Sequence, residues 1–343
     1  MKILKQAVGI DVSKGDFKIC LGQIDEAFNK EFTFSKAYEN TPKAIRLFLK
    51  EVCKQIVPGK TVQFVMEATG VYHEALAHSI YGSGFSVCIL LPNKAKAFIK
   101  SINQRAKTDK IDAEHLCQMG LERKLDDWEP ASPVFAEMRA LTRERENLIK
   151  EKSIIKNKAH ALNSAYFNAS SSKKRLVKRL YLLKQQISGI EKEIRSLIDS
   201  QEDIKARVEN IIKVKGISVV TVATIIAETN GFHLIRNQKQ LVGFSGLDVT
   251  VNQSGTVNKK GRLSKKGNSH IRKALYMPAL SASRKNELLK IQYEQLNKRQ
   301  SAKKQGIMVI AKKLLLLIYA LWKNETEYDP EKNIQNRLDL CAV

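Results

Sequence analysis

Cysteine is scarce in this sequence, and its few copies are scattered. The chain has 343 residues and only five cysteines, and it contains no Cys-x-x-Cys pair. Small secreted domains depend on a framework of paired cysteines, and structural zinc sites need closely spaced ones, so both classes are excluded. Free, dispersed thiols are typical of a reducing compartment, and we expect the protein to be cytoplasmic.

Long hydrophobic runs are also missing. The apolar run near the C-terminus covers residues 314–322, far fewer than the ~20 residues that cross a bilayer. The first five residues are followed by no apolar stretch of signal-peptide length. These features predict a protein that neither spans a membrane nor is secreted. Hydrophobic residues make up 43% of the chain, so a buried core can form and global disorder is excluded.

Acidic residues are outnumbered by basic ones. The chain carries 59 Lys and Arg against 35 Asp and Glu, a formal charge of +24. Residues 259–313 alone hold 16 basic residues and two acidic ones. A net charge of magnitude ~2–8 is sufficient to keep a small domain soluble, whereas a concentrated positive field attracts polyanions. The sequence therefore predicts nucleic-acid binding.

The chain length predicts two or three folded units at ~150 residues each. Short β-rich runs and helical segments alternate in residues 1–128 in the order βββαβαβα, which predicts a mixed α/β domain that one core can support. The predicted strands cover residues 7–13, 17–21, 31–35, 61–66 and 86–91, and the predicted helices begin near residues 41, 72 and 94.

Residues 129–210 show a different pattern. Apolar residues recur three and four positions apart, a spacing typical of amphipathic helices. A serine-rich break at residues 170–172 separates two such stretches. We expect two long helices that pair in a coiled-coil-like manner, either with each other or with a second subunit.

Residues 211–328 form the predicted third segment, a basic α-helical C-terminal domain. Two apolar helices flank a glycine in residues 211–229, and they resemble a helix-hairpin-helix element whose turn amides can grip a phosphate. An ordinary helical corner explains this pattern equally well. Residues 243–268 are rich in Gly, Ser and Lys and predict a loop that connects to further helices, and residues 329–343 predict a polar tail.

Four carboxylates stand out in the first segment. Asp11 lies within the first apolar strand and Glu67 ends the fourth, while Asp109 and Asp112 are three residues apart and share a helix face. Each alone could be an ordinary turn or capping residue. A carboxylate inside an apolar strand is nevertheless costly unless it is paired or binds a metal.

The combination of these carboxylates with the βββαβαβα order predicts a metal site. An RNase H-like sheet uses two strand carboxylates and a helical pair to hold two Mg²⁺ ions. Hard cations prefer oxygen ligands, and two of them ~3.5–4 Å apart can flank a scissile phosphate. We therefore expect Asp11, Glu67, Asp109 and Asp112 to be catalytic metal ligands, with two Mg²⁺ ions as the cofactor and Mn²⁺ as a substitute.

Short strings at both ends of the chain make a resemblance to a known family specific. The sequence resembles the DEDD-type transposases of the insertion sequence 110 family, a group that also contains a pilin-gene invertase. The matching strings, in the family's order, are residues 9–14 (GIDVSK), 66–72 (MEATGVY), 107–113 (KTDKIDA), 225–232 (IIAETNGF), 244–248 (FSGLD), 253–255 (QSG) and 263–268 (LSKKGN).

The resemblance implies a RuvC-like first domain and a serine nucleophile in the C-terminal domain, at the position of Ser254. From the residues alone, a serine before a glycine in a polar loop is usually a turn residue. A serine hydroxyl also needs a base or a metal for activation, which the acidic cluster could supply if the two domains share a site. Val249 stands where the family usually has proline. Ser264 and Ser245 are the alternative serine nucleophiles, and Tyr72 is a further candidate nucleophile.

Our hypothesis is a bacterial DNA recombinase that cuts and rejoins strands to mobilise its own insertion element. The resemblance implies that a noncoding bridge RNA selects donor and target DNA and that subunits form dimers and tetramers; the charge suits RNA and DNA equally. The enzymatic alternative is a RuvC-like structure-specific endonuclease that hydrolyses with water. The non-enzymatic alternative is a basic scaffold whose carboxylates only form ion pairs.

Overall fold

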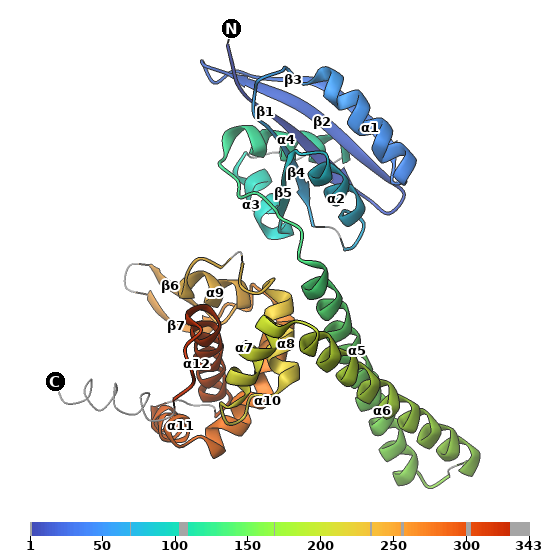
Figure 1. The fold of residues 1–343 in the computed structure, drawn as a ribbon, viewed down its shortest axis with the longest axis vertical. Helices are drawn as coiled ribbons and strands as arrows, with labels where there is room; N and C mark the ends of the chain where they lie inside the picture. Colours follow the sequence, from blue (N-terminus) through green and yellow to red (C-terminus); the bar gives the residue numbers. More distant parts are fainter. Residues whose placement is uncertain are drawn as a thin grey trace, which may run out of the picture. The chain divides into compact units, whose positions relative to one another are not determined.

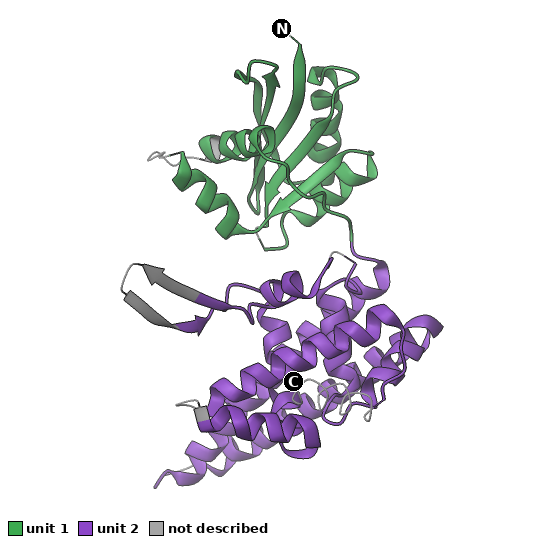
Figure 2. Ribbon diagram, turned by 90° about the vertical axis from the view of Figure 1, so that its left-hand side faces the viewer, with its two compact units in different colours: residues 1–130 green, residues 131–343 purple. Residues whose placement is uncertain are grey.

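The computed structural model describes residues 2–68, 70–102, 109–167, 169–233, 235–254, 257–299 and 303–329. It leaves the side chains of residues 109–110, 251–254, 257–260 and 299 undescribed. The chain divides into two compact units, residues 1–130 and 131–343 (Figure 2).

Unit 1 is built on a five-stranded sheet with the strand order β3-β2-β1-β4-β5 (Figure 1). The three N-terminal strands are antiparallel neighbours, whereas β4 and β5 run parallel to β1. The strands are β1 (Ile3–Val12), β2 (Asp16–Asp25), β3 (Lys30–Glu39), β4 (Val62–Glu67) and β5 (Ser86–Leu90).

Four helices cover the two faces of this sheet. They are α1 (Pro42–Gln55), α2 (Glu74–Gly82), α3 (Pro92–Ser101) and α4 (Asp109–Glu122). Side chains of α1 and α2 share one core with Ile10 and Met66, and side chains of α4 pack on the other face against Ala7 and Val65. The predicted mixed α/β sheet and the order of elements through β5 are confirmed, but two helices, α3 and α4, follow β5 where the prediction has one.

Thr41 and Pro42 illustrate how local sequence starts these helices. The Thr41 side chain accepts a hydrogen bond from the Ala44 amide, and Pro42 occupies the first turn of α1. A side-chain cap satisfies one of the amides that a helix start leaves without a partner, and proline suits a position whose amide is not needed.

In the residues of unit 2 that the structure describes, helices are interrupted by one hairpin. Its helices are α5 (Pro133–Ser164), α6 (Ser170–Asp199), α7 (Glu202–Ile212), α8 (Val219–Glu228), α9 (Gln238–Ser245), α10 (Ser269–Lys285), α11 (Glu287–Arg299) and α12 (Lys303–Asn324). Its two strands are β6 (Val249–Ser254) and β7 (Val257–Leu263), which pair antiparallel. The helical remainder of the fold is thereby confirmed.

One buried core joins most helices of unit 2. Met138 of α5 and Ile194 of α6 lie in the same cluster as Ile226 of α8, Leu275 of α10 and Leu314 of α12. Contacts therefore link the predicted middle segment to the C-terminal one. The coiled-coil pairing and the division at residue 210 remain predictions.

Helix α12 is long and apolar enough to cross a membrane, and it is the one described helix with this length and composition. Its apolar side chains, such as Ile310, Leu314 and Ile318, are fully buried in the core of unit 2. Core helices pass the same test, and the packing of α12 explains its composition.

The prediction of an unstructured loop at residues 243–268 is wrong. The segment contains the end of α9 and the β6–β7 hairpin. Its Gly, Ser and Lys residues obscured the alternation by which short strands are recognised. At residues 211–229 the structure shows two helices, α7 and α8, joined by a tight turn. Phosphate binding by that turn remains a prediction.

Candidate active site

Asp11 and Glu67 lie side by side at the carboxyl ends of two neighbouring parallel strands. The register pairs Ile10 of β1 with Met66 of β4, so the next position on each strand carries a carboxylate. Residues two apart on a strand share a face. Asp11 is therefore on the face of Ala7, and Glu67 is on the face of its neighbour Val65. This is the face that α4 covers.

Gly9 brings the N-terminal part of α4 directly onto β1. A Cβ atom at Gly9 would lie 2.1 Å from the Ala113 carbonyl oxygen and 2.2 Å from the Cys117 amide nitrogen. Farther along the same helix, the Lys5 ammonium donates a hydrogen bond to the Gly120 carbonyl at 2.6 Å. Helix α4 thus runs antiparallel to β1, and its first turn lies toward the end of the sheet that carries Asp11.

This close approach makes Gly9 a test of how α4 is positioned. We expect Gly9→Ala to lower the free energy of unfolding of the protein by about 3 kcal/mol, because the extra carbon meets backbone atoms that cannot give way. The matched control is Gly15→Ala, since a Cβ there has no atom within 4 Å. Urea unfolding monitored by circular dichroism measures both. Equal stability of the two variants would contradict the proposed packing of α4.

The other two predicted ligands belong to the first turn of α4. Asp112 is partly buried, and Asp109 is the first residue of the helix, but the Asp109 side chain lies outside the described residues. The structure thus brings three described carboxylates, from β1, β4 and α4, to one end and one face of the sheet. Their oxygen donors suit Mg²⁺.

No set of three or more His, Cys, Asp or Glu side chains gathers tightly enough to hold a metal ion within the part of the chain that the structure describes. Because the fourth predicted ligand, Asp109, lies outside that part, the four-carboxylate site remains a prediction.

Asn40 ties together the loops at this end of the sheet, and the sequence offered no signal for it. Its side-chain amide donates hydrogen bonds to the carbonyl oxygens of Ser13 and Tyr72, both at 3.0 Å. The loops that follow β1 and β4 are therefore joined. Tyr72, the further candidate nucleophile, lies in the loop that follows β4, and its side chain is 42% exposed.

In unit 2, Ser254 occupies the tip of the β6–β7 hairpin. It ends β6 and pairs with Val257, which begins β7. Its side chain lies outside the described residues. The departure from the family pattern, Val249, is the first residue of β6 and pairs with Leu263 at the base of the hairpin.

The two alternative serines have structural partners. Ser245 is completely buried and donates a hydrogen bond to the Val242 carbonyl within its own helix at 2.9 Å. Ser264 donates a hydrogen bond to the Asp248 carboxylate. Burial prevents Ser245 from reaching a phosphate, and the contact of Ser264 with Asp248 joins the two ends of the hairpin.

A polar network anchors the base of the hairpin. Arg143 of α5 binds the Glu228 carboxylate through two nitrogens, at 2.7 and 2.9 Å, and Glu228 also accepts a hydrogen bond from the Asn268 side chain at 2.6 Å. The Asn268 side chain also caps α10, and the Asn268 backbone amide donates a hydrogen bond to the Phe244 carbonyl at 2.7 Å. A buried carboxylate needs such partners, and the result is a rigid support for the segment that carries Ser254.

Glu146, a partly buried residue of α5, forms a second polar network with residues of α5 and α10. Burial acts to raise its pKa, but hydrogen bonds from Lys273, Lys150 and His270 outweigh burial and lower the pKa from 4.5 to about 2. The Glu146–Lys273 ion pair, at 2.7 Å, joins α5 to α10, and the Glu146–Lys150 pair, at 2.9 Å, lies within α5. The sequence pattern did not indicate this network, because its members are far apart along the chain.

The lowered pKa of Glu146 predicts a pH dependence of stability. Because folding lowers this pKa, the carboxylate stabilises the folded state fully above pH 4.5 and loses that contribution as the pH falls toward 2. We therefore expect Glu146→Gln to be less stable than the wild type at pH 7, with the difference shrinking by pH 2.5. Urea unfolding at both pH values measures this. Glu151→Gln, an exposed carboxylate of the same helix, is the control, and a difference for Glu146→Gln that does not change with pH would contradict the assignment.

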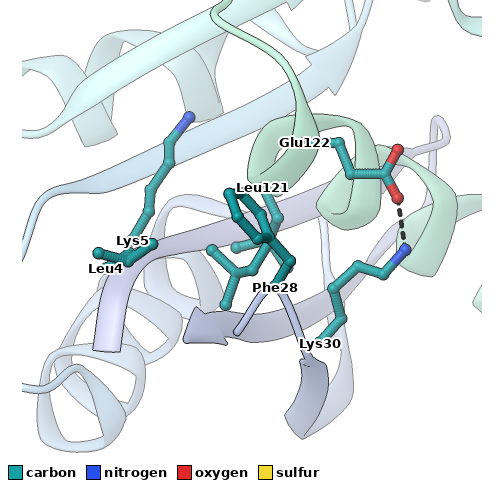
Figure 3. A pocket seen from close by; sticks show the side chains of 7 residues that line it. Leu4, Lys5, Phe28, Lys30, Leu121 and Glu122 are labelled. Atoms are coloured by element: carbon teal, nitrogen blue, oxygen red, sulfur yellow. Dashed lines mark hydrogen bonds and ion pairs between the residues drawn. The ribbon is translucent and has the colours of Figure 1, made fainter. Parts of the chain in front are cut away.

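A pocket of about 460 Å³ lies elsewhere in unit 1, near the start of β1 (Figure 3). Leu4, Lys5, Phe28 and Leu121 line it, together with the Lys30–Glu122 ion pair. The pocket lies near the start of β1, whereas Asp11 and Glu67 lie side by side near the carboxyl ends of β1 and β4. The candidate active site is therefore an edge of the sheet and not this pocket.

Comparison with known proteins gives two family matches. A family model for a DEDD transposase of the IS110 type, described as a transposase, matches residues 8–168, and a model of the transposase IS116/IS110/IS902 family matches residues 208–294. Pilin gene-inverting proteins of Moraxella bovis and Moraxella lacunata are 26% and 27% identical to this chain over 332 residues. Each alignment covers 95% of this chain and 98% of the relative.

Among solved structures, Thermus thermophilus RuvC gives a weak match to this chain. The structure of RuvC in complex with a Holliday junction substrate is 10% identical, with a TM-score of 0.26, and the match covers 33% of this chain and 90% of RuvC. A second RuvC structure is 13% identical, with a TM-score of 0.25, and the match covers 37% of this chain and 85% of RuvC.

Proposed function

Because this chain belongs to the IS110 family of transposases, and is therefore a DNA-processing transposase or recombinase, we propose that it cuts and rejoins DNA strands by metal-dependent phosphoryl transfer to mobilise its own insertion sequence. The carrying observation is the convergence of Asp11, Glu67 and the first turn of α4 at one edge of the sheet. The strand order supports an RNase H-like, RuvC-like identity for unit 1.

The four carboxylates are the proposed ligands of two Mg²⁺ ions. When bound, such ions hold a phosphate and neutralise the charge that develops on it during displacement. Asp11 and Glu67 are held by the sheet and Asp112 by α4, so these side chains come from rigid elements and reach the site with little loss of freedom. Their role is to bind and to orient.

Ser254 is the proposed nucleophile. Its hydroxyl oxygen would attack a DNA phosphate, forming a phosphoserine ester while the bond from phosphorus to one sugar oxygen breaks. The serine proton ends on that sugar oxygen, which leaves as a free hydroxyl. A hydroxyl of another DNA end would then attack the phosphoserine and restore Ser254. Bond energy is kept in the ester, so rejoining needs no external energy source. The position of Ser254 at the tip of an anchored hairpin supports this role.

Three further features belong to this proposal. The positive charge of residues 259–313 supports binding of DNA and of a noncoding bridge RNA that selects donor and target. Exposed apolar side chains on α6, namely Val177, Tyr181 and Leu182, support assembly into dimers or tetramers. A bacterial cytoplasmic location, on the nucleoid when bound to DNA, follows from a chromosomal substrate.

A reconstituted strand-exchange reaction tests the proposal. Purified protein is incubated with donor DNA carrying both element ends, target DNA, and RNA transcribed from the element's flanks, in Mg²⁺ or in EDTA. We expect recombinant joints only when Mg²⁺ and the RNA are both present. Joints formed in EDTA would overturn the metal-dependent mechanism, and joints formed without RNA would overturn the guidance by RNA. Cut products with no joints would instead indicate an endonuclease that hydrolyses with water.

A further inference from the structure

The α5–α6 hairpin ends in two exposed aromatic rings. Tyr166 and Phe167 lie in the connection between the helices, and their side chains are 93% and 87% exposed. The rings contact each other edge to face, with centroids 4.8 Å apart. Aromatic rings are anchors of binding surfaces, because they bury a large rigid area on contact. Neither ring contributes to the cores of unit 2.

The surroundings of these rings carry charge of one sign only. Residues 152–190, the distal part of the hairpin, contain no Asp or Glu. All the basic residues there except the partly buried Lys152 are exposed. Figure 1 shows this part of the hairpin projecting away from the remaining helices of unit 2. The basic residues are Lys152, Lys156, Lys158, Lys173, Lys174, Arg175, Lys178, Arg179 and Lys184.

The start of α6 adds to this field. The N-cap, Ala169, provides no side-chain hydrogen bond, and the first turn of α6 contains no acidic residue. The first amides of a helix carry partial positive charge and donate hydrogen bonds to phosphate oxygens readily when no side chain caps them. Lys173, Lys174 and Arg175 follow immediately. Phosphate-binding groups therefore lie within a few residues of Tyr166 and Phe167.

We propose that the tip of the α5–α6 hairpin, composed of Tyr166, Phe167 and the cations of residues 152–184, binds unpaired nucleotides of a nucleic-acid strand. The two rings stack on bases, and the cations contact the phosphates that flank them, which is how proteins hold single strands. The inference rests on the proposed function in one respect, namely that the enzyme handles strands that become unpaired.

Charge and geometry favour this occupant over the others. In a duplex the faces of the bases are already stacked, so exposed rings would find no partner, whereas unpaired bases offer theirs. Two copies that met at Tyr166 and Phe167 would bring the cations next to the rings, Lys158 and Lys173–Arg175, against each other, and like charges in an interface oppose association. The apolar residues of α6 proposed above for assembly, at positions 177–182, lie farther along the helix from the rings.

Binding of short oligonucleotides to the full-length protein tests the proposal. We measure fluorescence anisotropy with a single-stranded DNA of about 12 nucleotides, an RNA of the same sequence and a blunt duplex, all without Mg²⁺. The variant Tyr166→Leu/Phe167→Leu keeps apolar surface but removes both rings. We expect it to bind single strands about 10-fold more weakly, and the duplex within about 2-fold of wild type. Phe28→Leu, which removes an exposed ring of unit 1 (74% exposed), should change neither the single-strand affinity nor the duplex affinity.

Two further variants separate stacking from charge. Tyr166→Trp keeps an aromatic ring at this position, so it should bind single strands at least as tightly as wild type. The fluorescence of the new tryptophan should be quenched when bases stack on it. Lys173→Gln/Lys174→Gln/Arg175→Gln should reduce the slope of log affinity against log salt by about two for single strands. Lys43→Gln/Arg46→Gln/Lys50→Gln, on the exposed side of α1, removes equal charge and should leave the slope for single strands near the wild-type value.

The outcomes are distinct from those of the proposed function. Binding here is measured without Mg²⁺ and without cleavage, so a failure of the metal-dependent mechanism would leave these results unchanged. A larger loss with RNA assigns the tip to RNA, and a larger loss with DNA assigns it to a displaced DNA strand. The proposal is overturned if the double leucine variant keeps its affinity for single strands. It is equally overturned if that variant weakens duplex binding to the same extent, or if the variant changes the sedimentation of the protein while single-strand affinity is unchanged.

Discussion

Asp11→Asn is expected to slow strand cleavage about 1000-fold while leaving DNA affinity nearly unchanged. The substitution keeps the size of the side chain and removes the negative charge that the proposed site needs to hold a divalent cation. Loss of one electrostatic stabiliser of a charged transition state typically costs 10²- to 10³-fold. Glu67→Gln should have a similar effect, since Glu67 is the neighbouring position on the next strand.

The matched control for these variants is Glu39→Gln. Glu39 ends β3 as Glu67 ends β4, but it is exposed and lies on a different strand. Cleavage is measured on end-labelled element DNA, and folding is checked by thermal unfolding. Cleavage near the wild-type rate in both Asp11→Asn and Glu67→Gln would remove the carboxylates from the mechanism.

Ser254→Ala is expected to abolish rejoining and any covalent link between protein and DNA. The substitution removes the one oxygen that would form the phosphoserine ester, and no neighbouring atom of the side chain can replace it. The predicted effect is a complete loss of adduct on a denaturing gel, together with loss of recombinant joints. DNA binding should be unchanged, because a single uncharged hydroxyl contributes little to backbone affinity.

Ser264→Ala is the matched control for this variant. Ser264 lies in the same segment but donates its hydrogen bond to Asp248 at the base of the hairpin, so the variant should retain adduct formation. If Ser254→Ala still cuts DNA at the wild-type rate and releases free ends, water and not serine is the nucleophile. If only Ser264→Ala loses the adduct, the nucleophile has been assigned to the wrong serine.

The strands that carry Asp11 and Glu67 could be predicted because their local sequence is unambiguous. Each is a short apolar run bounded by turn residues, and its carboxylate is conspicuous against apolar neighbours such as Ile10 and Met66. The pairing of β1 with β4 does not follow from a direct β-α-β connection, because β2, β3 and α1 lie between them along the chain. Local pattern therefore predicted the two strands and their carboxylates, and the structure adds that the two positions are neighbours.

The contacts that place the other groups could not be predicted in this way. The approach of α4 to Gly9 depends on packing between residues about a hundred positions apart. The β6–β7 hairpin was predicted as a loop because its polar residues lack the alternation of a half-buried strand. The ion pair of Arg143 with Glu228 joins two helices whose charges look like ordinary solvated residues when read along the chain.

Mass spectrometry of a trapped protein–DNA adduct is the most direct test of the central proposal, namely that Ser254 is the nucleophile of a reaction that depends on the carboxylates of the sheet. Wild type and Asp11→Asn are incubated with element-end DNA in Mg²⁺, digested with nuclease and trypsin, and sequenced by fragmentation. The tryptic peptide 240–259 contains both Ser245 and Ser254, so fragmentation distinguishes them. The account predicts a nucleotide on Ser254 in the wild type and none in Asp11→Asn. A nucleotide on another residue, or an adduct of equal yield in Asp11→Asn, would contradict it.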